Sequence, residues 1–259
     1  MEERSDSGYS SLTLTLAPTL PPMLSLHTYA SPPHACSYLP DRVARMRYEV
    51  VGDLTPAEYL ARMNAGWRRF GFTLFRPACS RCRMCQPVRV PVAAFRPDRS
   101  QKRAWAANAD EIGVVVGPPA VTADKLALYD RFHAFQADDK GWSEHGPKDA
   151  ADYADSFVEN PFPTEEWCYY AGDRLVGVGY VDALPGALSA IYFFHDPAER
   201  RRSLGTFNVL SVLRAAADRG VPHVYLGYYV EGCRSLEYKG RFRPNEVLGP
   251  DGVWGPFLE

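Results

Sequence analysis

Three cysteines spaced by three residues, Cys79, Cys82 and Cys85, constrain the fold of this chain more than any other feature of its sequence. Thiols this close together cannot form three separate long-range disulfides, and six cysteines in 259 residues are too few for a disulfide scaffold. The spacing is typical of a loop that binds a thiophilic metal in a reducing compartment. It therefore predicts a compact unit organised around this loop.

A tetrahedral site built on this loop needs a fourth ligand, and Cys36, which opens the same unit, is predicted to supply it. The spacing does not distinguish zinc from an iron–sulfur cluster, and structural thiols without a metal are the alternative. With either metal, the neighbouring arginines are expected to lower the thiol pKa values and favour the thiolate.

The cysteine loop lies in the most basic part of the chain. Residues 62–103 contain eleven Lys and Arg and one acid, a net charge of +10, whereas the whole chain carries −2 and the remainder therefore −12. This asymmetry predicts a polyanionic partner, with a solvated basic face as the alternative. The residues predicted to contact nucleic acid are Arg68, Arg69, Arg76, Arg99, Lys102 and Arg103.

The bulk sequence predicts a cytoplasmic protein of one or two domains. The first residues are acidic where a secretory signal is basic, and no apolar run approaches the ~18 residues of a membrane helix. With a domain boundary at Pro118-Pro119, we expect a partly ordered tail over 1–33, with an added edge strand as the alternative. A basic cysteine-containing domain is expected over 34–117 and a GNAT-like acyltransferase domain over 118–259.

Helix and strand signals in the first half flank the cysteine loop. Thr55-Pro56-Ala57-Glu58 predicts a capped helix that ends at Gly66. Short strands are expected over 72–76 and 88–92, and a helix over 100–107.

The second half predicts an α/β (α+β) fold. A helix over 126–135 precedes a meander of strands at 167–171, 175–182 and 188–195, and a helix over 204–218 leads to a strand over 223–230. The order strand, basic glycine-containing loop, helix, strand is typical of a GNAT-like N-acyltransferase fold. There the loop amides and the helix N-terminus hold a phosphate, which makes Ser203 and Gly205 candidate binding residues. Phe207 departs from the acetyl-CoA version of this loop.

Two further regions carry candidate site residues. His195-Asp196 ends a predicted strand and suits proton transfer, with a local hydrogen bond as the alternative. After the strand that contains Tyr228, Tyr238, Lys239 and Arg241 could bind a carboxylate or the 3′ end of an RNA, with a surface helix as the alternative.

Taken together, these motifs resemble the aminoacyl-tRNA–protein transferases of the N-degron pathway, and the bacterial aspartate/glutamate leucyltransferases most closely. The stretches that carry the resemblance are Cys36–Pro40, Gly66–Arg69, Arg76–Pro77 with the three cysteines, Pro87–Val90, Arg99–Arg103, Ser203–Thr206, Tyr225–Tyr228, Tyr238–Lys239 and Arg241–Pro244.

The resemblance implies transfer of leucine or arginine from its tRNA to the N-terminal Asp or Glu of a protein, with no cofactor required for the chemistry. It also implies a doubled GNAT arrangement, and metal binding by cysteines of the first half, as in eukaryotic arginyl relatives. We expect Asp196 or a water it holds to assist proton removal, Tyr228 or amides near Ser203 to face the oxyanion or the terminal adenosine, and Lys239 or Arg241 to recognise the acidic acceptor.

Departures from the family pattern leave the donated amino acid open. Phe70 replaces a serine, residues 132–136 lack an Arg-His pair, and His195 replaces an aromatic residue. The competing hypotheses are an acetyl-CoA-dependent N-acetyltransferase and a non-enzymatic tRNA-binding redox sensor.

Overall fold

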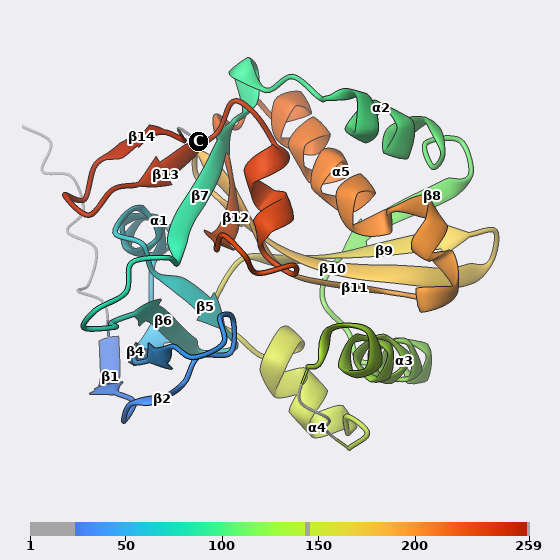
Figure 1. Cartoon of the computed structure of the whole chain (residues 1–259). Coiled ribbons are helices and arrows are strands. Elements are labelled where there is room, and N and C mark those ends of the chain that lie inside the picture. The colour runs from blue at the N-terminus through green and yellow to red at the C-terminus, as the bar shows by residue number, and fades with distance from the viewer. Residues whose placement is uncertain (1–23, 143–145, 258–259) are drawn as a thin grey trace, which may run out of the picture.

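The structure, a computed structural model, describes residues 24–142 and 146–257 and is a mixed α/β fold built on two main sheets (Figure 1). The part of the predicted tail before residue 24 lies outside the described residues, and residues 24–30 form strand β1. None of the helices in residues 24–142 and 146–257 has the length and apolar character needed to cross a membrane.

Within the described residues, the larger sheet has eight strands, and its only parallel pair is β11 with β12. In spatial order the strands are β14 (Trp254–Pro256), β13 (Glu246–Leu248), β7 (Gln86–Pro91), β12 (His223–Tyr229), β11 (Ala187–His195), β10 (Arg174–Leu184), β9 (Thr164–Ala171) and β8 (Ile112–Gly117). Strands β7 and β8 precede the predicted domain boundary and the other six follow it, so this sheet draws on both parts of the chain.

The smaller sheet is antiparallel and lies beside the cysteine loop. Its strands, in spatial order, are β1 (Leu24–Ala30), β4 (Met46–Asp53), β6 (Thr73–Pro77) and β5 (Arg68–Phe70). A two-stranded ribbon of β2 (His34–Ala35) and β3 (Val43–Ala44) stands next to it.

Helices cover both faces of the eight-stranded sheet. In Figure 1, α5 (Leu204–Asp218) and α2 (Arg99–Ala106) lie on one face, and α3 (Ala123–Lys140) with α4 (Ala150–Tyr153) lies on the other. The remaining helical segments are α1 (Pro56–Asn64), η1 (Val92–Ala94), η2 (Ala154–Val158), η3 (Pro197–Arg202) and η4 (Glu237–Arg241). Separate apolar cores fill the two interfaces, around Phe207 under α5 and around Phe194 under α3.

Several predicted elements are confirmed. Helix α1 has Thr55 as its N-cap in a complete capping box with Glu58, and α5 spans the predicted residues. Strand β4, which the sequence analysis did not identify, is the central partner of β1 and β6.

Candidate functional site

The parallel strands β11 and β12 pair only at their beginnings. Their register joins Ala187 to His223, Leu188 to Val224 and Ser189 to Tyr225, and no later pair is formed among the described residues. β11 continues to His195 and β12 to Tyr229, so the strands diverge. Peptide groups on the facing edges are left without a strand partner, which is suitable for binding an extended ligand.

Arg68, the first residue of β5, reaches β12 near the point where β11 and β12 diverge. Its side chain is buried; Nη1 donates to the carbonyls of Met63 at 3.2 Å and Trp67 at 2.6 Å, and Nη2 donates to Gly227 O at 3.4 Å. Its Nε makes no hydrogen bond to any residue that the structure describes. Burial lowers the pKa of this guanidinium, and the nearby hydroxyls of Tyr228, Tyr59 and Tyr225 oppose the shift only in part.

Lys239, in η4, approaches the same point of β12. A Cβ added to Gly227 would lie 3.2 Å from Lys239 Nζ, and Gly227 has a φ of +85° at a bulge of β12. Burial and the charge of Arg68 lower the pKa of Lys239 to about 8. The sequence analysis did not single out Gly227, although a glycine in the interior of a strand can indicate a bulge or a close approach.

The other two predicted residues of this segment, Tyr238 and Arg241, also belong to η4, and within the described part of the chain neither forms a hydrogen bond or ion pair with Lys239. Burial raises the pKa of Tyr238 to about 12, and its ring stands 6.4 Å from that of Phe242. The side chain of Arg241 is exposed, while its backbone carbonyl accepts from Gln101 Nε2 at 3.1 Å.

Arg69 does not share the environment of Arg68. Its guanidinium is buried, with Nε bound to Asp182 Oδ2 at 2.7 Å and Nη2 to Thr164 Oγ1 at 2.6 Å. Because these partners occupy the guanidinium inside the protein, its position argues against the predicted contact with tRNA.

Tyr228 lies on β12 between the cations and the cysteine loop. Its hydroxyl donates to Gly66 O at 2.9 Å, with Phe75 O also within reach at 3.3 Å. The ring is buried and lies 5.6 Å below the Arg68 guanidinium. The single phenolic proton is thus committed to backbone carbonyls that join the two sheets, which does not favour its predicted role at the oxyanion.

Asp196 directly follows β11 and organises the loop that leads to α5. Its Oδ1 accepts from Ala198 N at 2.9 Å, and its Oδ2 pairs with Arg174 at 3.0 Å and Arg131 at 3.8 Å. Arg174 also pairs with Glu199, whose pKa it lowers. Both carboxylate oxygens of Asp196 are therefore engaged in holding the loop.

His195 has a different hydrogen-bonding state. Its Nδ1 lies 3.1 Å from the backbone carbonyl of Asp196, so Nδ1 carries the donated proton and Nε2 is left as an acceptor. Burial, together with Lys140, lowers the pKa of His195, which keeps the imidazole neutral at pH 7.

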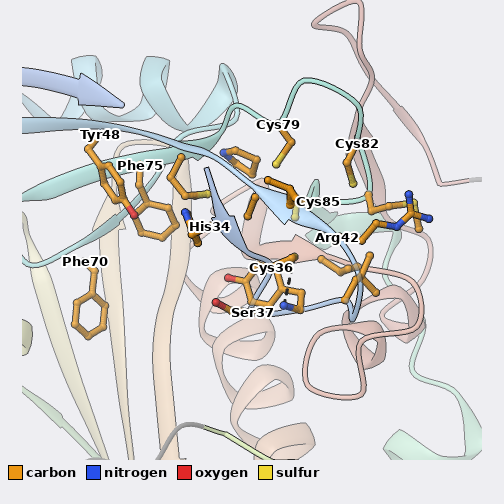
Figure 2. Close-up of a pocket in the computed structure, with 18 residues that line it drawn as sticks. His34, Cys36, Ser37, Arg42, Tyr48, Phe70, Phe75, Cys79, Cys82 and Cys85 are labelled. Carbon is orange, nitrogen blue, oxygen red and sulfur yellow. Dashed lines mark hydrogen bonds between the residues drawn. The ribbon is translucent and has the colours of Figure 1, made fainter. Parts of the chain in front are cut away.

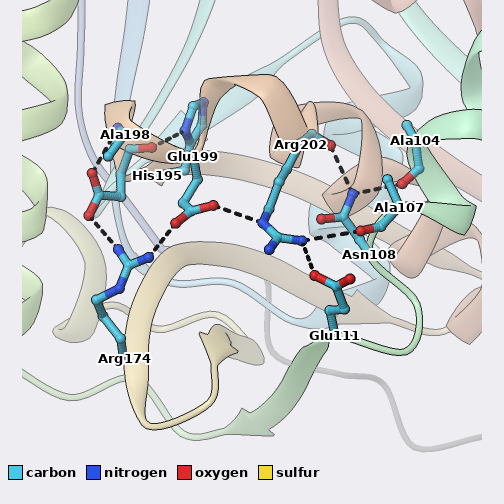
Figure 3. Close-up of polar contacts among 10 residues, drawn as sticks. Ala104, Ala107, Asn108, Glu111, Arg174, His195, Ala198, Glu199 and Arg202 are labelled. Carbon is cyan, nitrogen blue, oxygen red and sulfur yellow. Dashed lines mark hydrogen bonds and ion pairs between the residues drawn. The ribbon is translucent and has the colours of Figure 1, made fainter.

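The loop before α5 is anchored to the end of α2. Arg202 binds Glu111 at 2.7 Å and Glu199 at 2.8 Å, and its carbonyl accepts from Asn108 Nδ2 at 2.8 Å (Figure 3). Ser203 has a φ of +56° and does not cap α5 with its side chain, and a Cβ added to Gly205 would meet no atom outside its own helix within 4 Å. The N-terminus of α5 is therefore open at the two predicted residues.

The four predicted metal ligands, Cys36, Cys79, Cys82 and Cys85, line one cavity of about 300 Å³ between the small sheet and the β2–β3 ribbon (Figure 2). Within residues 24–142 and 146–257, however, His, Cys, Asp and Glu form no group of three or more that could hold a metal. The donor set suits zinc or an iron–sulfur cluster by its chemistry, and the described side chains do not converge on one point.

The expected lowering of the thiol pKa values is wrong for Cys85. Burial, followed by the charges of Cys36, Cys79, Cys82 and Cys233, raises the pKa of the Cys85 thiol to about 12. The flanking arginines Arg81 and Arg83 are exposed to solvent and do not compensate for burial. A bound cation would reverse this direction, because coordination deprotonates the thiol.

The basic segment does not form one surface. Arg99, Lys102 and Arg103 are exposed on α2, which packs near α5, whereas the cysteine loop lies on the other side of Figure 1. Arg76 stacks over the ring of Trp67 at 4.9 Å. Three exposed arginines that the prediction omitted, Arg42, Arg45 and Arg47, come from β3, β4 and the turns beside them, next to the cysteine cavity.

Known proteins match this chain over most of its length. Residues 34–103 match the family model described as arginine-tRNA-protein transferase, N terminus, and residues 124–249 match the model of its C terminus. The aspartate/glutamate leucyltransferase of Pseudomonas fluorescens (strain SBW25) is 38% identical over 234 residues, which is 86% of this chain and 94% of that protein.

Two further relatives carry the same name. The Helicobacter hepaticus protein is 34% identical over 91% of this chain and 98% of its own length, and the Nitrosococcus oceani protein is 37% identical over 89% and 96%. Among solved structures, the C-terminal domain of a protein described as a lysylphosphatidylglycerol synthetase from Agrobacterium fabrum is a distant match. Its TM-score is 0.47 at 13% identity, over 82% of this chain and 78% of that one. The extent of the family-model and sequence matches shows that the chain belongs to the arginine-tRNA–protein transferase family.

Proposed function

We propose that this chain transfers leucine from leucyl-tRNA to the N-terminal Asp or Glu of proteins and so marks them for degradation by the N-degron pathway. The observation that carries this proposal is the match, at 34–38% identity, to relatives named aspartate/glutamate leucyltransferase. Arginine is the second candidate donor, because the matching family models are named for arginine.

The reaction suits a GNAT-like core. The antiparallel strands β9, β10 and β11, followed by η3, α5 and the parallel strand β12, have the order expected of an acyltransferase. The divergence of β11 and β12 offers unpaired peptide groups to the acyl donor. We further propose that the domain boundary lies between residues 117 and 118 and that the part before it forms a second GNAT-like unit.

Two groups of exposed cations would hold the tRNA. One comprises Arg99, Lys102 and Arg103 of α2, and near it lies the η3 loop, where Arg200 and Arg201 are exposed. The other group lies around the cysteine cavity and comprises the exposed arginines Arg42, Arg45, Arg47, Arg81 and Arg83. In the part of the chain that the structure describes, no acidic residue forms an ion pair with any cation of either group, which leaves them available to phosphates.

The chemistry requires alignment and the removal of one proton. An aminoacyl ester is activated, so its aminolysis to an amide needs no ATP. The α-ammonium group of the acceptor has an ordinary pKa of ~7.7–8.0, so a weak base near neutral pH suffices. The nitrogen attacks the ester carbonyl, the tetrahedral oxyanion collapses, and the ribose hydroxyl of the tRNA leaves.

His195 is the better candidate for the proton acceptor than Asp196. The oxygens of Asp196 are already held by Ala198 N and Arg174, whereas Nε2 of a neutral His195 can accept a proton. Asp196 would then position the loop. The open N-terminus of α5 at Ser203 and Gly205 would face the oxyanion or the terminal nucleotide of the tRNA.

The cysteines have a structural place in this proposal. Zinc or an iron–sulfur cluster held by Cys36, Cys79, Cys82 and Cys85 would fix the loop beside the tRNA and would supply no step of the aminolysis.

A transfer assay tests the proposed function. A peptide with N-terminal Glu is incubated anaerobically with labelled leucyl-tRNA, arginyl-tRNA or acetyl-CoA in parallel. Label from leucyl-tRNA is the expected result. Label from acetyl-CoA alone would place the protein among N-acetyltransferases, and tRNA binding without any transfer would support the redox-sensor hypothesis instead.

A further inference from the structure

Two cations approach Gly227, the buried Arg68 and the half-buried Lys239. Arg68 Nη2 donates to Gly227 O at 3.4 Å from one side, and Lys239 Nζ comes within 3.2 Å of the position that a Cβ of residue 227 would take. The positive φ of Gly227 turns its carbonyl out of the regular ladder of β12, and its lack of a side chain admits the ammonium group. The bulge therefore brings both charges to the same residue of β12.

No described carboxylate neutralises this pair. Every ion pair in residues 24–142 and 146–257 involves other basic residues, and Lys239 Nζ makes no hydrogen bond there. Arg68 is only 5% exposed, and its Nε has no partner in the described part of the chain. The neighbouring Arg69, by contrast, has a carboxylate of its own in Asp182. A buried charge beside a half-buried charge of the same sign is unfavourable unless an anion joins them, and such arrangements are typical of binding sites.

We propose that Arg68 and Lys239 form the subsite that binds the side-chain carboxylate of the acceptor's N-terminal Asp or Glu. The proposal rests on the proposed function and assigns the recognition of the acidic acceptor to two named residues. Arg68 supplies a fixed charge on β5, and Lys239 supplies a mobile one on η4.

The burial of the pair favours a carboxylate over a phosphate of the tRNA backbone. A single side chain can enter between two partly enclosed cations, whereas phosphates on a rigid duplex are reached by exposed arginines such as those of α2. The flexible stem of Lys239 allows the subsite to follow carboxylates of two lengths, which accounts for acceptance of both Asp and Glu. A neutral amide in the same place would leave the two charges uncompensated, so Asn and Gln would be rejected.

The test compares acceptor peptides that differ only in their first residue. Transfer from saturating leucyl-tRNA to peptides beginning with Glu, Gln, Asp and Asn is measured for the wild type, Lys239→Met and Lys239→Arg. The matched control is Arg214→Met, which removes an exposed cation from α5. Arg68→Lys is the second variant, because removal of the whole Arg68 side chain could prevent folding.

We expect Lys239→Met to raise the KM for the Glu peptide by about 10- to 100-fold, the usual loss for one charged hydrogen bond. The preference for Glu over Gln should fall by the same factor, and Lys239→Arg should restore most of it. The KM for leucyl-tRNA and the behaviour of Arg214→Met should not change. Arg68→Lys should lower the same preference while the circular dichroism spectrum stays that of the wild type.

Three results would overturn the proposal. An unchanged preference for Glu with a raised KM for leucyl-tRNA would assign the pair to a tRNA phosphate. An equal loss of kcat for Glu and Gln peptides would assign it to the reacting carbonyl. If the wild type transfers nothing, the proposed function fails and calorimetry decides on the subsite separately: the Glu peptide should bind more tightly than the Gln peptide, and equal binding would refute the carboxylate site.

Discussion

Arg69 Nε donates to Asp182 Oδ2 at 2.7 Å and so joins β5 of the small sheet to β10 of the large one. Tyr59 donates to the same oxygen at 2.9 Å, and Thr164 Oγ1 donates to Oδ1 at 2.8 Å. Asp182 is fully buried, yet each of its oxygens has a partner. The two sheets are therefore joined by a satisfied internal ion pair, supported by the apolar cluster around Tyr59 and Leu74.

Removal of one member of this pair should destabilise the protein strongly. We expect Arg69→Met to lower the free energy of unfolding by about 3–5 kcal/mol, because it leaves an uncompensated carboxylate in the interior. The double variant Arg69→Met with Asp182→Leu should recover a large part of the loss. Urea denaturation followed by circular dichroism measures both changes.

The exposed pair Arg219–Glu165 is the matched control for that experiment. Replacement of Arg219 by Met should cost less than about 1 kcal/mol, as is usual for surface ion pairs. Equal losses at Arg69 and Arg219 would contradict the structural role of the internal pair.

The different environments of Arg68 and Arg69 could not be predicted from the sequence. Both residues counted equally toward the charge of +10 over residues 62–103, but Arg69 is paired with Asp182, whereas Arg68 has no carboxylate partner among the residues that the structure describes. Asp182 lies more than a hundred positions later in the chain, so no local pattern links it to Arg69. Charge along a sequence can be counted, whereas burial and pairing arise only from the tertiary fold.

Local signals were sufficient for elements that have their own caps and periodicity. The capping box at Thr55 and Glu58 located α1, and the apolar face of residues 204–218 located α5. Strand β8 (Ile112–Gly117) contains three consecutive valines, all exposed at the edge of the sheet. Its sequence therefore shows no alternation of apolar and polar residues. Long-range pairing, as of β7 with β12, also has no local signature.

Exposed cations on α2 should govern affinity for tRNA. Arg99→Ala with Lys102→Ala is expected to weaken tRNA binding. The slope of log affinity against log salt concentration should fall in magnitude by about 1–2, because fewer phosphate contacts release fewer counterions on binding. The thermal midpoint should not change, since both side chains are exposed. Filter binding at several salt concentrations measures this.

The cysteine-loop arginines test the second surface by the same method. Arg81→Ala with Arg83→Ala should also reduce the slope if the tRNA spans both groups. Unchanged affinity at moderate salt for both double variants would exclude the two surfaces as the tRNA platform.

Loss of a cysteine should destabilise the loop if a metal is bound. We expect Cys82→Ser to lower the thermal midpoint and the content of zinc or iron in protein purified without oxygen, because a four-ligand site contributes folding energy. Cys168→Ser is the control, since Cys168 is buried on β9 and does not line the cysteine cavity. No metal in the wild type together with an unchanged midpoint in Cys82→Ser would refute the metal site.

Substitution of His195 separates proton transfer from loop positioning. His195→Gln should lower kcat with leucyl-tRNA by about 10²- to 10⁴-fold and remove the acidic limb of the pH–rate profile. That limb should lie below the ordinary imidazole pKa of ~6.5, because burial lowers the pKa of His195. Asp196→Asn should reduce stability while the limb is retained. The reverse pattern, with the limb lost only in Asp196→Asn, would restore Asp196 as the proton acceptor.

The charge of Lys239 should make acceptor selection depend on pH. Its pKa is lowered from an ordinary 10.5 to about 8, first by burial and then by the charge of Arg68, with Cys233 acting in the opposite direction. The side chain of Lys239 is therefore positively charged at pH 7 and loses this charge as the pH rises through about 8. We expect the preference for Glu over Gln peptides to fall between pH 7 and 9 in the wild type and to stay constant in Lys239→Arg.

The ratio of kcat/KM for the two peptides isolates this effect, because both share an α-amino group that titrates near the same pH. Stability should move in the opposite direction. The folded-state pKa of Lys239 lies below the unfolded one, so the unfolded chain binds more protons between about pH 8 and 10.5, and folding gains stability as the pH rises through that range. The thermal midpoint of the wild type should rise over this range relative to that of Lys239→Met. If the difference between the two thermal midpoints and the preference for Glu both stay constant with pH, Lys239 titrates normally and does not take part in recognising the acceptor.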